Sequence, residues 1–374
     1  MNTTIWARTS LIAVALILGA GVVCAQGDVG VAVWNVVAQQ RPGTHLFDVT
    51  YDLETGDGLP VTVSVWLSTD AGVSISHHCQ AVSGAVGDDI MPGTGLAIVW
   101  DAGSDLPSFN GTTCQLRITA FAAQNLDGFV LIPPGSFMMG SPPDEPGRLD
   151  DEVQHMVALT QGFYISSTEV TEEWWDDVMG SGSSTSQLPQ NYVTWDMAVE
   201  FCNELSLREG LTPAYSINGS TYHVTWNREA NGYRIPTEAE WEYACRAGSQ
   251  TAFFNGPITY VECEPVDPNL DQAGWYCGNS GHMRHVVGQK QANAWGLHDM
   301  HGSLFEQVWD TYRYDYENLP EVDPTHYEGP RSRRVVRGGF GSSYARRTRS
   351  ACRVDFEPAG PHYADGFRPV RTAD

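Results

Sequence analysis

Two kinds of hydrophobic pattern divide this chain. In the first third, apolar and polar residues alternate, most regularly over residues 61–68, and the alternation recurs over 47–51 and 116–120. A period of two is typical of strands that bury one face, and turn signals rich in Gly and Asp separate these segments. The pattern predicts an all-β sandwich over residues 27–123.

Helical spacing appears only after residue 126. Thr194 is a predicted helix N-cap, apolar residues follow it at helical spacing, and Gly210 ends the segment. A second helix opens with a capping box, in which Thr237 caps and Glu240 occupies the third helical position. The helices are short, the connections are long, and Gly and Pro are frequent. Residues 126–374 are therefore predicted to form an irregular α+β domain.

The N-terminus carries an uncharged apolar run from Leu11 to Val23. This run is shorter than the about 20 residues that a membrane-spanning helix needs, and it suits the hydrophobic region of a signal peptide. The small residue Ala25 suits cleavage directly after it, although acylation of Cys24 is a competing interpretation. We expect residues 1–25 to be a signal peptide. The mature chain is then exported (periplasmic, cell-surface or secreted) without insertion into the membrane.

Charge narrows the range of partners. The chain has 45 acidic and 21 basic residues, for a formal net charge of −24. Nucleic acids and anionic membranes need basic surface, so they are excluded as main partners. Lys290 is the only lysine and lies outside any phosphate-binding Gly-rich motif, which excludes P-loop chemistry.

Cysteines point to disulfides rather than to zinc. Seven remain after the signal peptide, and none forms a Cys-x-x-Cys pair. Cys79 and Cys114 flank predicted strands, and we expect a disulfide between them. Cys263 and Cys277 lie fourteen residues apart in a loop-rich stretch and are candidates for a local disulfide.

A series of ordered motifs in the second part of the chain resembles the sulfatase-modifying-factor, or formylglycine-generating-enzyme, family over about residues 126–374. The resemblance implies a variant of the C-type lectin fold, poor in regular secondary structure. The preceding β segment resembles immunoglobulin or fibronectin type III modules in pattern alone. The motifs that carry the family resemblance are Phe129–Gly140, Phe163–Ile165, Glu169–Thr171, Gly232–Gly248, Asn293–Leu297, Asp299–Gly302, Arg337–Gly339 and Gly366–Arg368.

The resemblance also identifies what is missing. Oxidases of this family use copper(I) to convert a sulfatase cysteine to formylglycine. Two cysteines after the Arg-Gly-Gly turn bind the copper in those oxidases. Here the matching positions are Ser343 and Thr348, and Phe340 stands where those oxidases have a serine. Copper(I) prefers soft thiolates to hydroxyls. We therefore expect no copper and no catalytic residues of the oxidase type.

Further assignments follow from the resemblance alone. It implies a disulfide between Cys245 and Cys352. It leaves Cys202 without a partner, because Pro369 occupies the matching position. We expect Cys202 to be a buried, inert thiol.

The resemblance implies a structural calcium ion as well. Its ligands would be the carboxylates of Asp299 and Glu306 and the backbone carbonyls of Gly302 and Leu304. Such oxygen donors are the ligands that calcium takes. The alternative is that both acids accept hydrogen bonds from the Arg-rich C-terminal segment.

That segment holds eight arginines between residues 331 and 353. In an acidic protein they either pair with internal carboxylates or line an anion pocket, and internal pairing is the favoured interpretation. Ser343 and Arg346 are the candidate pocket residues.

Two classes of function remain. The first is a non-oxidase binding member of the family, which holds an exported protein, a peptide or a glycan. The alternative is a protein-modifying enzyme of the formylglycine-generating type that acts on an exported substrate. The missing cysteine pair favours binding.

Overall fold

The computed structural model divides the chain into two compact units, residues 1–124 and 125–374, next to the boundary expected between 123 and 126. Each unit is described by itself. The expected signal peptide lies outside the described residues except for Val23 and Cys24. The structure describes residues 23–24, 32–55, 58, 61–68, 77–105, 115–122, 126, 128–219, 223–316, 319–329, 332–357 and 360–373.

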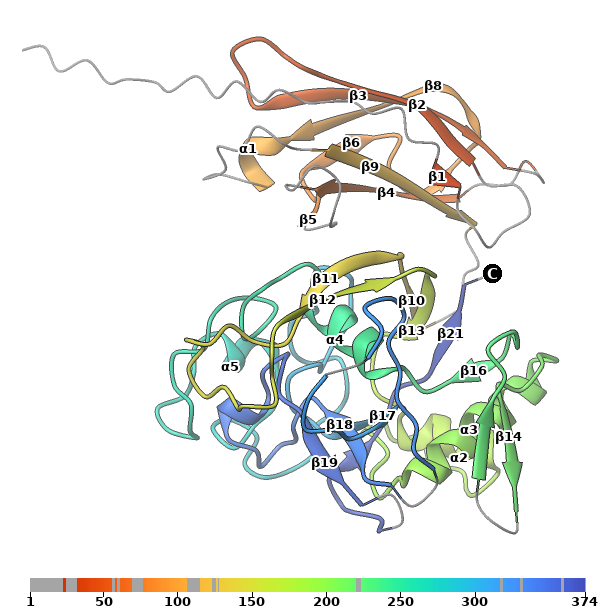
Figure 1. Ribbon diagram of the computed structural model, residues 1–374, viewed down its shortest axis with the longest axis vertical. Coiled ribbons are helices and arrows are strands. Elements are labelled where there is room, and N and C mark those ends of the chain that lie inside the picture. The colour runs from red at the N-terminus through yellow and green to blue at the C-terminus, as the bar shows by residue number, and fades with distance from the viewer. Residues whose placement is uncertain are drawn as a thin grey trace, which may run out of the picture. The chain divides into compact units, whose positions relative to one another are not determined.

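Unit 1 consists of two antiparallel sheets (Figure 1). One has the strand order β1-β2-β3-β8-β6, and in the other β4 pairs with β9 on one side and with β5 and β7 on the other. The elements are β1 (Val23–Cys24), β2 (Ala32–Gln40), β3 (Leu46–Glu54), β4 (Val61–Ser68), β5 (His77–His78), β6 (Val82–Gly84), β7 (Gly87–Ile90), β8 (Gly93–Asp101), α1 (Ala102–Asp105) and β9 (Gln115–Ala122).

The alternating apolar side chains of the strands form the core of unit 1. On β4 the side chains of Val61, Val63, Val65 and Leu67 are at most 1% exposed. They pack in one cluster with apolar residues of the five-stranded sheet, such as Val49. The strands predicted over 47–51, 61–68 and 116–120 are thus confirmed, and the two sheets share one hydrophobic core.

Unit 2 is strand-rich but irregular. Its sheets have the orders β10-β13-β21-β16 and β19-β18-β17-β20, with two separate hairpins, β11-β12 and β14-β15. Within the second sheet β17 and β20 run parallel, and the other pairs are antiparallel. The strands are β10 (Phe129–Ile132), β11 (Gly135–Met139), β12 (His155–Leu159), β13 (Phe163–Ser166), β14 (Tyr215–Asn218), β15 (His223–Trp226), β16 (Tyr233–Arg234), β17 (Phe305–Thr311), β18 (Arg334–Arg337), β19 (Val354–Phe356), β20 (Asp365–Gly366) and β21 (Val370–Thr372).

Two helices of unit 2, α3 and α4, begin where the capping signals predicted. Those that the structure describes are α2 (Glu172–Met179), α3 (Trp195–Arg208), α4 (Glu238–Arg246), α5 (Leu270–Ala273) and the 3-10 turn η1 (Ala345–Arg347). The Thr194 side chain accepts a hydrogen bond from the Met197 amide at the start of α3. At α4 the complete capping box between Thr237 and Glu240 is present. Both predicted helix starts are confirmed.

Two hydrophobic clusters hold these elements around β17 and β18. One is built on α3 and includes Trp195 and Trp309. The other is built on α4 and includes Trp241, Val308 and Val335. All residues of β17 and β18 are buried. This rigid base fixes the point at which the segment after β18, which carries Ser343 and Thr348, leaves the sheet.

Candidate functional site

The segment that follows β18 makes a sharp turn at two glycines. Gly338 and Gly339 have φ angles of +85° and +77°, a region that favours glycine. A Cβ atom on Gly339 would lie 2.7 Å from the Thr348 Cγ2 atom and 2.9 Å from the Arg347 carbonyl oxygen. The Arg-Gly-Gly motif therefore lets the chain turn back tightly against η1.

Ser343 is buried and its hydroxyl serves the local turn. The Phe340 amide donates to Ser343 Oγ at 3.0 Å, and the Ser343 amide donates to the Phe340 carbonyl at 2.7 Å. The side chain thus closes a turn on its own segment.

Thr348 is buried still more deeply, with 0% exposure. Its Oγ1 donates to the Ala345 carbonyl at 2.9 Å, and its own carbonyl oxygen lies 2.8 Å from His301 Nδ1. Because His301 Nε2 accepts a hydrogen bond from the Phe254 amide, Nδ1 carries the proton. Burial lowers the pKa of His301 to about 4. The hydroxyls of Ser343 and Thr348, which the family resemblance matches to the copper ligands, are therefore both engaged in local hydrogen bonds.

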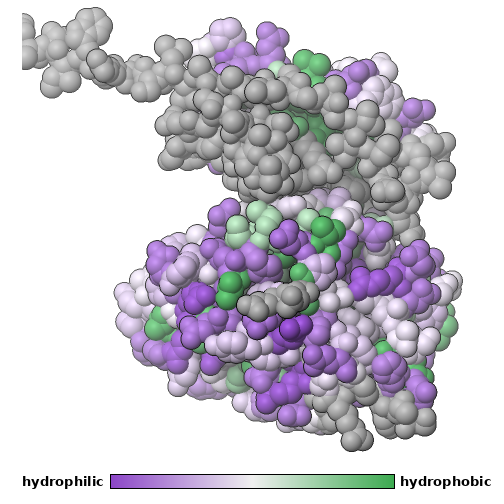
Figure 2. Space-filling view, viewed as in Figure 1, coloured by the Kyte–Doolittle hydropathy of each residue, from purple (hydrophilic) through white to green (hydrophobic). Residues whose placement is uncertain are grey.

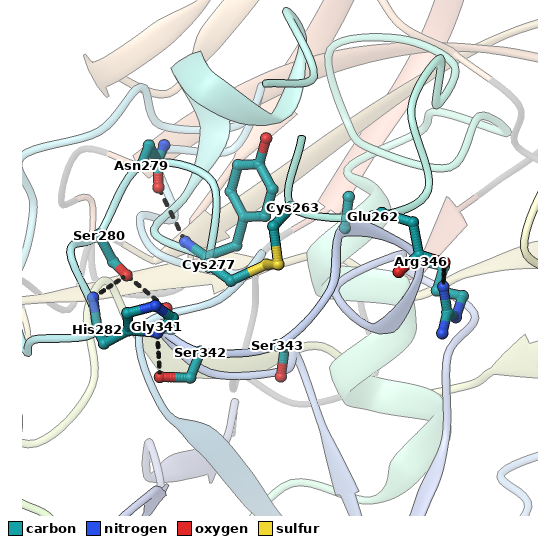
Figure 3. The surroundings of a disulfide bond; sticks show 12 residues. Glu262, Cys263, Cys277, Asn279, Ser280, His282, Gly341, Ser342, Ser343 and Arg346 are labelled. Carbon is teal, nitrogen blue, oxygen red and sulfur yellow. Dashed lines mark hydrogen bonds and ion pairs between the residues drawn. A yellow bond between two sulfur atoms is a disulfide. The ribbon is translucent and has the colours of Figure 1, made fainter. Parts of the chain in front are cut away.

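A neighbouring loop packs against this segment (Figure 3). Ser280 Oγ donates to the Gly341 carbonyl, and His282 Nδ1 lies 3.0 Å from Ser342 Oγ. Arg346 forms an ion pair with Glu262 of the same loop. Arg346 is half-buried. This candidate pocket residue is thus engaged by an internal carboxylate.

The predicted disulfides need correction. The Cys263–Cys277 bond is present, with the Cα atoms 5.2 Å apart, and Cys202 is a buried free thiol as expected. Cys245 and Cys352, however, are both free. Cys79 is also free and buried, and its expected partner Cys114 lies outside the described residues.

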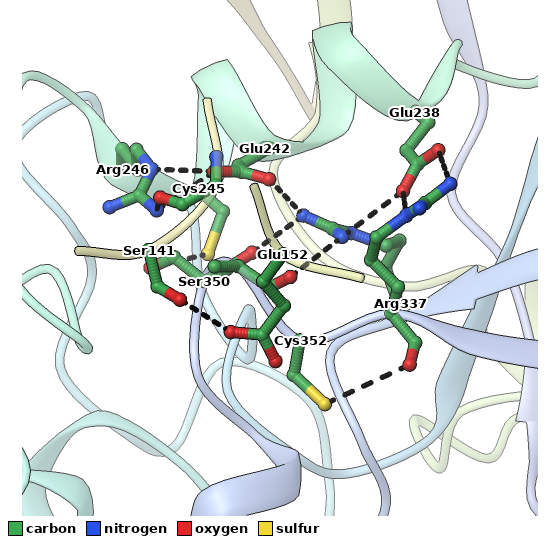
Figure 4. A network of polar contacts seen from close by, with 12 residues as sticks. Ser141, Glu152, Glu238, Glu242, Cys245, Arg246, Arg337, Ser350 and Cys352 are labelled. Atoms are coloured by element: carbon green, nitrogen blue, oxygen red, sulfur yellow. Dashed lines mark hydrogen bonds and ion pairs between the residues drawn. The ribbon is translucent and has the colours of Figure 1, made fainter. Parts of the chain in front are cut away.

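The Cys245 and Cys352 sulfurs have different neighbours. The Cys245 sulfur faces Ser350 Oγ, at 3.6 Å, and the His301 ring, whereas the Cys352 sulfur lies 4.0 Å from the Arg353 carbonyl oxygen (Figure 4). Arg337 donates to the carbonyls of residues 350 and 351 and so fixes the backbone just before Cys352. The two sulfurs are held by different partners.

Most of the arginine cluster pairs with carboxylates inside the unit, as favoured. Arg337 contacts both Glu238 and Glu242 of α4, and Arg353 also binds Glu238 (Figure 4). Arg349 binds Glu152 and Glu145. Buried arginines of this kind tie the terminal segment to the core and do not form an anion pocket. Arg331 lies outside the described residues.

The expected calcium ligands are partly engaged by the protein itself. Both oxygens of Glu306 accept hydrogen bonds from Arg368, at 2.7 Å each, and Trp241 Nε1 donates to one of them. Asp299 differs, because Gly288 donates to its Oδ2 while its buried Oδ1 has no partner among the described residues. Glu306 is thus bound by an arginine near the C-terminus, as the alternative interpretation has it, although Arg368 lies outside the Arg-rich segment of residues 331–353. Asp299 keeps one carboxylate oxygen without a partner among the described residues.

A third acid, Glu169, joins this cluster. Its carboxylate accepts hydrogen bonds from Ser303 Oγ and from the Leu304 amide. Burial, together with the neighbouring charges of Asp299 and Glu306, raises its pKa well above the usual value. Sequence reasoning missed Glu169 as a site residue, although it lies in a quoted motif. In the described part of the chain no three His, Cys, Asp or Glu side chains are arranged to hold a metal ion.

A pocket of about 500 Å³ lies elsewhere, along α2. Its acids already have partners, since Asp176 accepts from Ser181 and Ser184, and Asp177 pairs with Arg208. No sequence motif had pointed to this pocket. It is lined by Glu173, Trp174, Asp176, Asp177, Gly182, Ser183 and Ser184.

Comparison with known families agrees with the motifs. Residues 116–373, well over half of the chain, match the family described as sulfatase-modifying factor enzyme 1-like domain. The chain belongs to this family. Its match begins inside β9, ahead of the boundary between the two units.

Individual family relatives are moderately similar. The chaperone protein LppX of Paenibacillus barcinonensis is 32% identical over 243 residues, covering 56% of this chain and 80% of that protein. The formylglycine-generating enzyme of Mus musculus is 27% identical over 285 residues, covering 65% and 74%. Among solved structures, Treponema denticola variable protein 1 is 27% identical with a TM-score of 0.54, over 65% of this chain and 94% of that one. The fold is thus the mixed, strand-rich fold of these family members.

Proposed function

We propose that this chain is an exported, non-oxidase member of its family that binds a protein, peptide or glycan ligand. The binding surface is the face around Ser343, defined here by His282, Met283, Ser342, Tyr344 and Arg346. No step of copper chemistry is assigned to it.

One observation carries the proposal. The two positions that hold copper(I) in the family's oxidases are Ser343 and Thr348, and both hydroxyls already bond to backbone groups of their own segment. A neutral hydroxyl is a hard, weak donor, and copper(I) requires soft thiolates. The donor set therefore does not fit the ion.

The three free thiols of unit 2 do not replace the missing pair. Cys202, Cys245 and Cys352 are fully buried, and burial raises the pKa of each of them, for Cys245 to about 12. At neutral pH these groups are thiols, and only the thiolate is a strong metal ligand or nucleophile. They are inert core side chains.

Composition and exposure support binding at the Ser343 face. Tyr344 is 46% exposed and Met283 is 66% exposed. The Arg346 guanidinium lies 4.6 Å from the centre of the Tyr344 ring. Tyr, Ser and Arg on loops are typical of recognition surfaces, because they combine large contact area with hydrogen bonding. The coloured surface of unit 2 in Figure 2 is mostly hydrophilic with scattered apolar residues.

Export is supported by two features. The apolar run before Cys24 suits a signal peptide, and the Cys263–Cys277 disulfide suits an oxidising compartment. In the described part of the chain, no helix is long and apolar enough to cross a membrane.

Reconstitution with copper(I) tests the proposal. The purified chain is loaded with copper(I) and incubated in air with a cysteine-containing sulfatase peptide, and the peptide is analysed by mass spectrometry. We expect no formylglycine above a control without protein and no copper(I) retained against a chelator. Aldehyde formed well above the control would overturn the proposal in favour of the modifying enzyme.

A matched variant makes the negative result meaningful. Ser343→Cys with Thr348→Cys restores thiols at both positions, and Ser343→Ala with Thr348→Ala is its control. We expect the cysteine variant alone to retain copper(I). For binding, candidate peptides and glycans are titrated against the wild type and against Tyr344→Ala, and weaker binding by the variant is the expected result.

A further inference from the structure

We infer that the Cys263–Cys277 disulfide is a redox-sensitive clamp on the Ser343 face. It joins two arms of one loop, residues 261–263 and residues 277–282, and these arms hold residues 341–346 from two sides. The inference concerns the regulation of the proposed binding face, and in that respect it rests on the proposed function.

The first arm holds the far end of the clamped segment. The Arg346 amide donates to the Val261 carbonyl at 3.0 Å, and the Arg346 guanidinium pairs with the Glu262 carboxylate. Gly147 packs closely here as well, because a Cβ atom on it would lie 2.6 Å from the Arg346 Cβ. Arg346 is thus fixed through both its backbone and its side chain.

The second arm holds the near end. The Cys277 amide donates to the Ser343 carbonyl at 3.1 Å, and Ser280 Oγ donates to the Gly341 carbonyl. His282 Nδ1 lies 3.0 Å from Ser342 Oγ. Residues 341, 342 and 343 are therefore all bound by this arm, and Figure 3 shows the contacts of Ser280 and His282.

The disulfide lies where the arms meet. Cys263 ends the first arm and Cys277 begins the second, and their sulfurs are bonded directly. Gly278 packs against the junction, since a Cβ atom there would lie 2.6 Å from the Cys263 carbonyl oxygen. Without the bond, the only covalent link between the arms is the chain of residues between them.

Those intervening residues are organised locally, so the loop itself does not depend on the disulfide. One carboxylate oxygen of Asp267 accepts from the amides of Thr259 and Tyr260, and the other accepts from Asn269 and Leu270. Phe253, Leu270 and Tyr276 form a small core that also buries Ala345 of the segment. Reduction is therefore expected to loosen the grip on residues 341–346 without unfolding the unit.

A dithiol reduces the Cys263–Cys277 bond in a two-electron exchange. The dithiol is oxidised to its own disulfide, and the Cys263–Cys277 bond takes up two electrons and two protons to give two thiols. Cys79, Cys202, Cys245 and Cys352 are already free thiols, so among these cysteine pairs only Cys263–Cys277 offers a bond for the dithiol to reduce.

Hydrogen exchange measured by mass spectrometry tests the clamp without any ligand. We compare the oxidised chain, the chain treated with dithiothreitol, and the variant Cys263→Ser with Cys277→Ser. We expect amides of residues 341–346 to exchange about tenfold faster or more in the last two samples, whereas amides of α3 stay unchanged. Cys202→Ser, which removes a thiol but no bond, is the control and should match the oxidised chain.

Equal protection of residues 341–346 in the oxidised and the reduced chain would overturn the clamp. If the double variant does not fold, the reduced wild type still decides the question. The binding titration is a separate readout, so failure of the clamp and failure of the proposed function are distinguishable. Where a ligand has been found, its affinity should fall in the reduced chain.

Discussion

Asp365 is an unusual residue in this core. Its side chain is fully buried, and neither carboxylate oxygen has a hydrogen-bond partner among the described residues. The nearest imidazole nitrogen, His362 Nδ1, lies 3.9 Å away. Burial raises the pKa of Asp365 from 3.8 to about 7. The folded protein therefore keeps this carboxyl protonated under conditions where the unfolded chain ionises it.

This pKa difference predicts a pH dependence of stability. Between the two pKa values the folded state binds more protons than the unfolded state, so stability falls as pH rises through that window and is greatest below it. Thermal melting at about pH 5 and about pH 8 measures the effect. We expect the loss of stability to be smaller in Asp365→Asn, which cannot ionise. Burial also raises the pKa of Asp310 to about 7, so part of the pH dependence of stability remains in the variant.

An equal pH slope in the wild type and in Asp365→Asn would show that Asp365 does not titrate in this window. Each pKa unit corresponds to about 1.4 kcal/mol, so the stability losses of the wild type and the variant between the two pH values should differ by at most a few kcal/mol. Asp365→Glu keeps an ionisable carboxyl and is the control that separates ionisation from packing.

At the scale of elements, α4 is the helix on which the charge network is built. It supplies Glu238 and Glu242 to the buried arginines of the terminal segment. Its start is fixed by the capping box, in which the Glu240 amide donates to Thr237 Oγ1 and the Thr237 amide donates to the Glu240 side chain. The orientation of the first turn of α4 thus sets the positions of the Glu238 and Glu242 carboxylates.

Removal of this cap has a predictable cost. Thr237→Ala leaves the Glu240 amide without its partner, and loss of an N-cap side chain typically lowers the free energy of unfolding by about 1 kcal/mol. Chemical denaturation measures the change. Thr237→Ser keeps the hydroxyl and should stay close to the wild type. A Thr237→Ala variant as stable as Thr237→Ser would contradict the role of the cap.

Capped helices and alternating strands could be predicted from the sequence. The disulfide bonds could be predicted only in part. Caps and alternating strands depend on neighbours within a few residues, which the sequence displays directly. The surroundings of Cys245 and Cys352 involve residues far along the chain: Ser350 lies beside the Cys245 sulfur, and Arg337 binds the carbonyls just before Cys352. Glu169 was missed for the same reason, because its nearest acids, Asp299 and Glu306, come from a distant segment.

At the scale of the whole molecule, the cluster of Glu169, Asp299 and Glu306 has an imbalance of charge. Three carboxylates face one guanidinium, that of Arg368. Burial is the main cause that raises the pKa of both Glu169 and Asp299. A bound cation would relieve the repulsion, which keeps calcium at Asp299 as a prediction.

Calcium should then stabilise the protein by mass action, because an ion that binds only the folded state raises the melting temperature. We expect a higher melting temperature in calcium than in chelator, and loss of this response in Asp299→Asn. Glu306→Gln is a poorer test, since it also removes the partner of Arg368. If the wild type melted at the same temperature in calcium and in chelator, the predicted calcium site would be wrong.

The single lysine gives this acidic chain a property of practical use. Lys290 lies over the ring of Trp275, with its Nζ atom 4.0 Å from the ring centre. A protease that cuts only after lysine divides the denatured polypeptide once, and Cys352 is the only cysteine beyond the cut. The two fragments stay covalently joined without reductant only if Cys352 is bonded to an earlier cysteine. Since Cys352 is a free thiol, they should separate as two bands on a non-reducing gel, provided that iodoacetamide blocks the thiols before digestion.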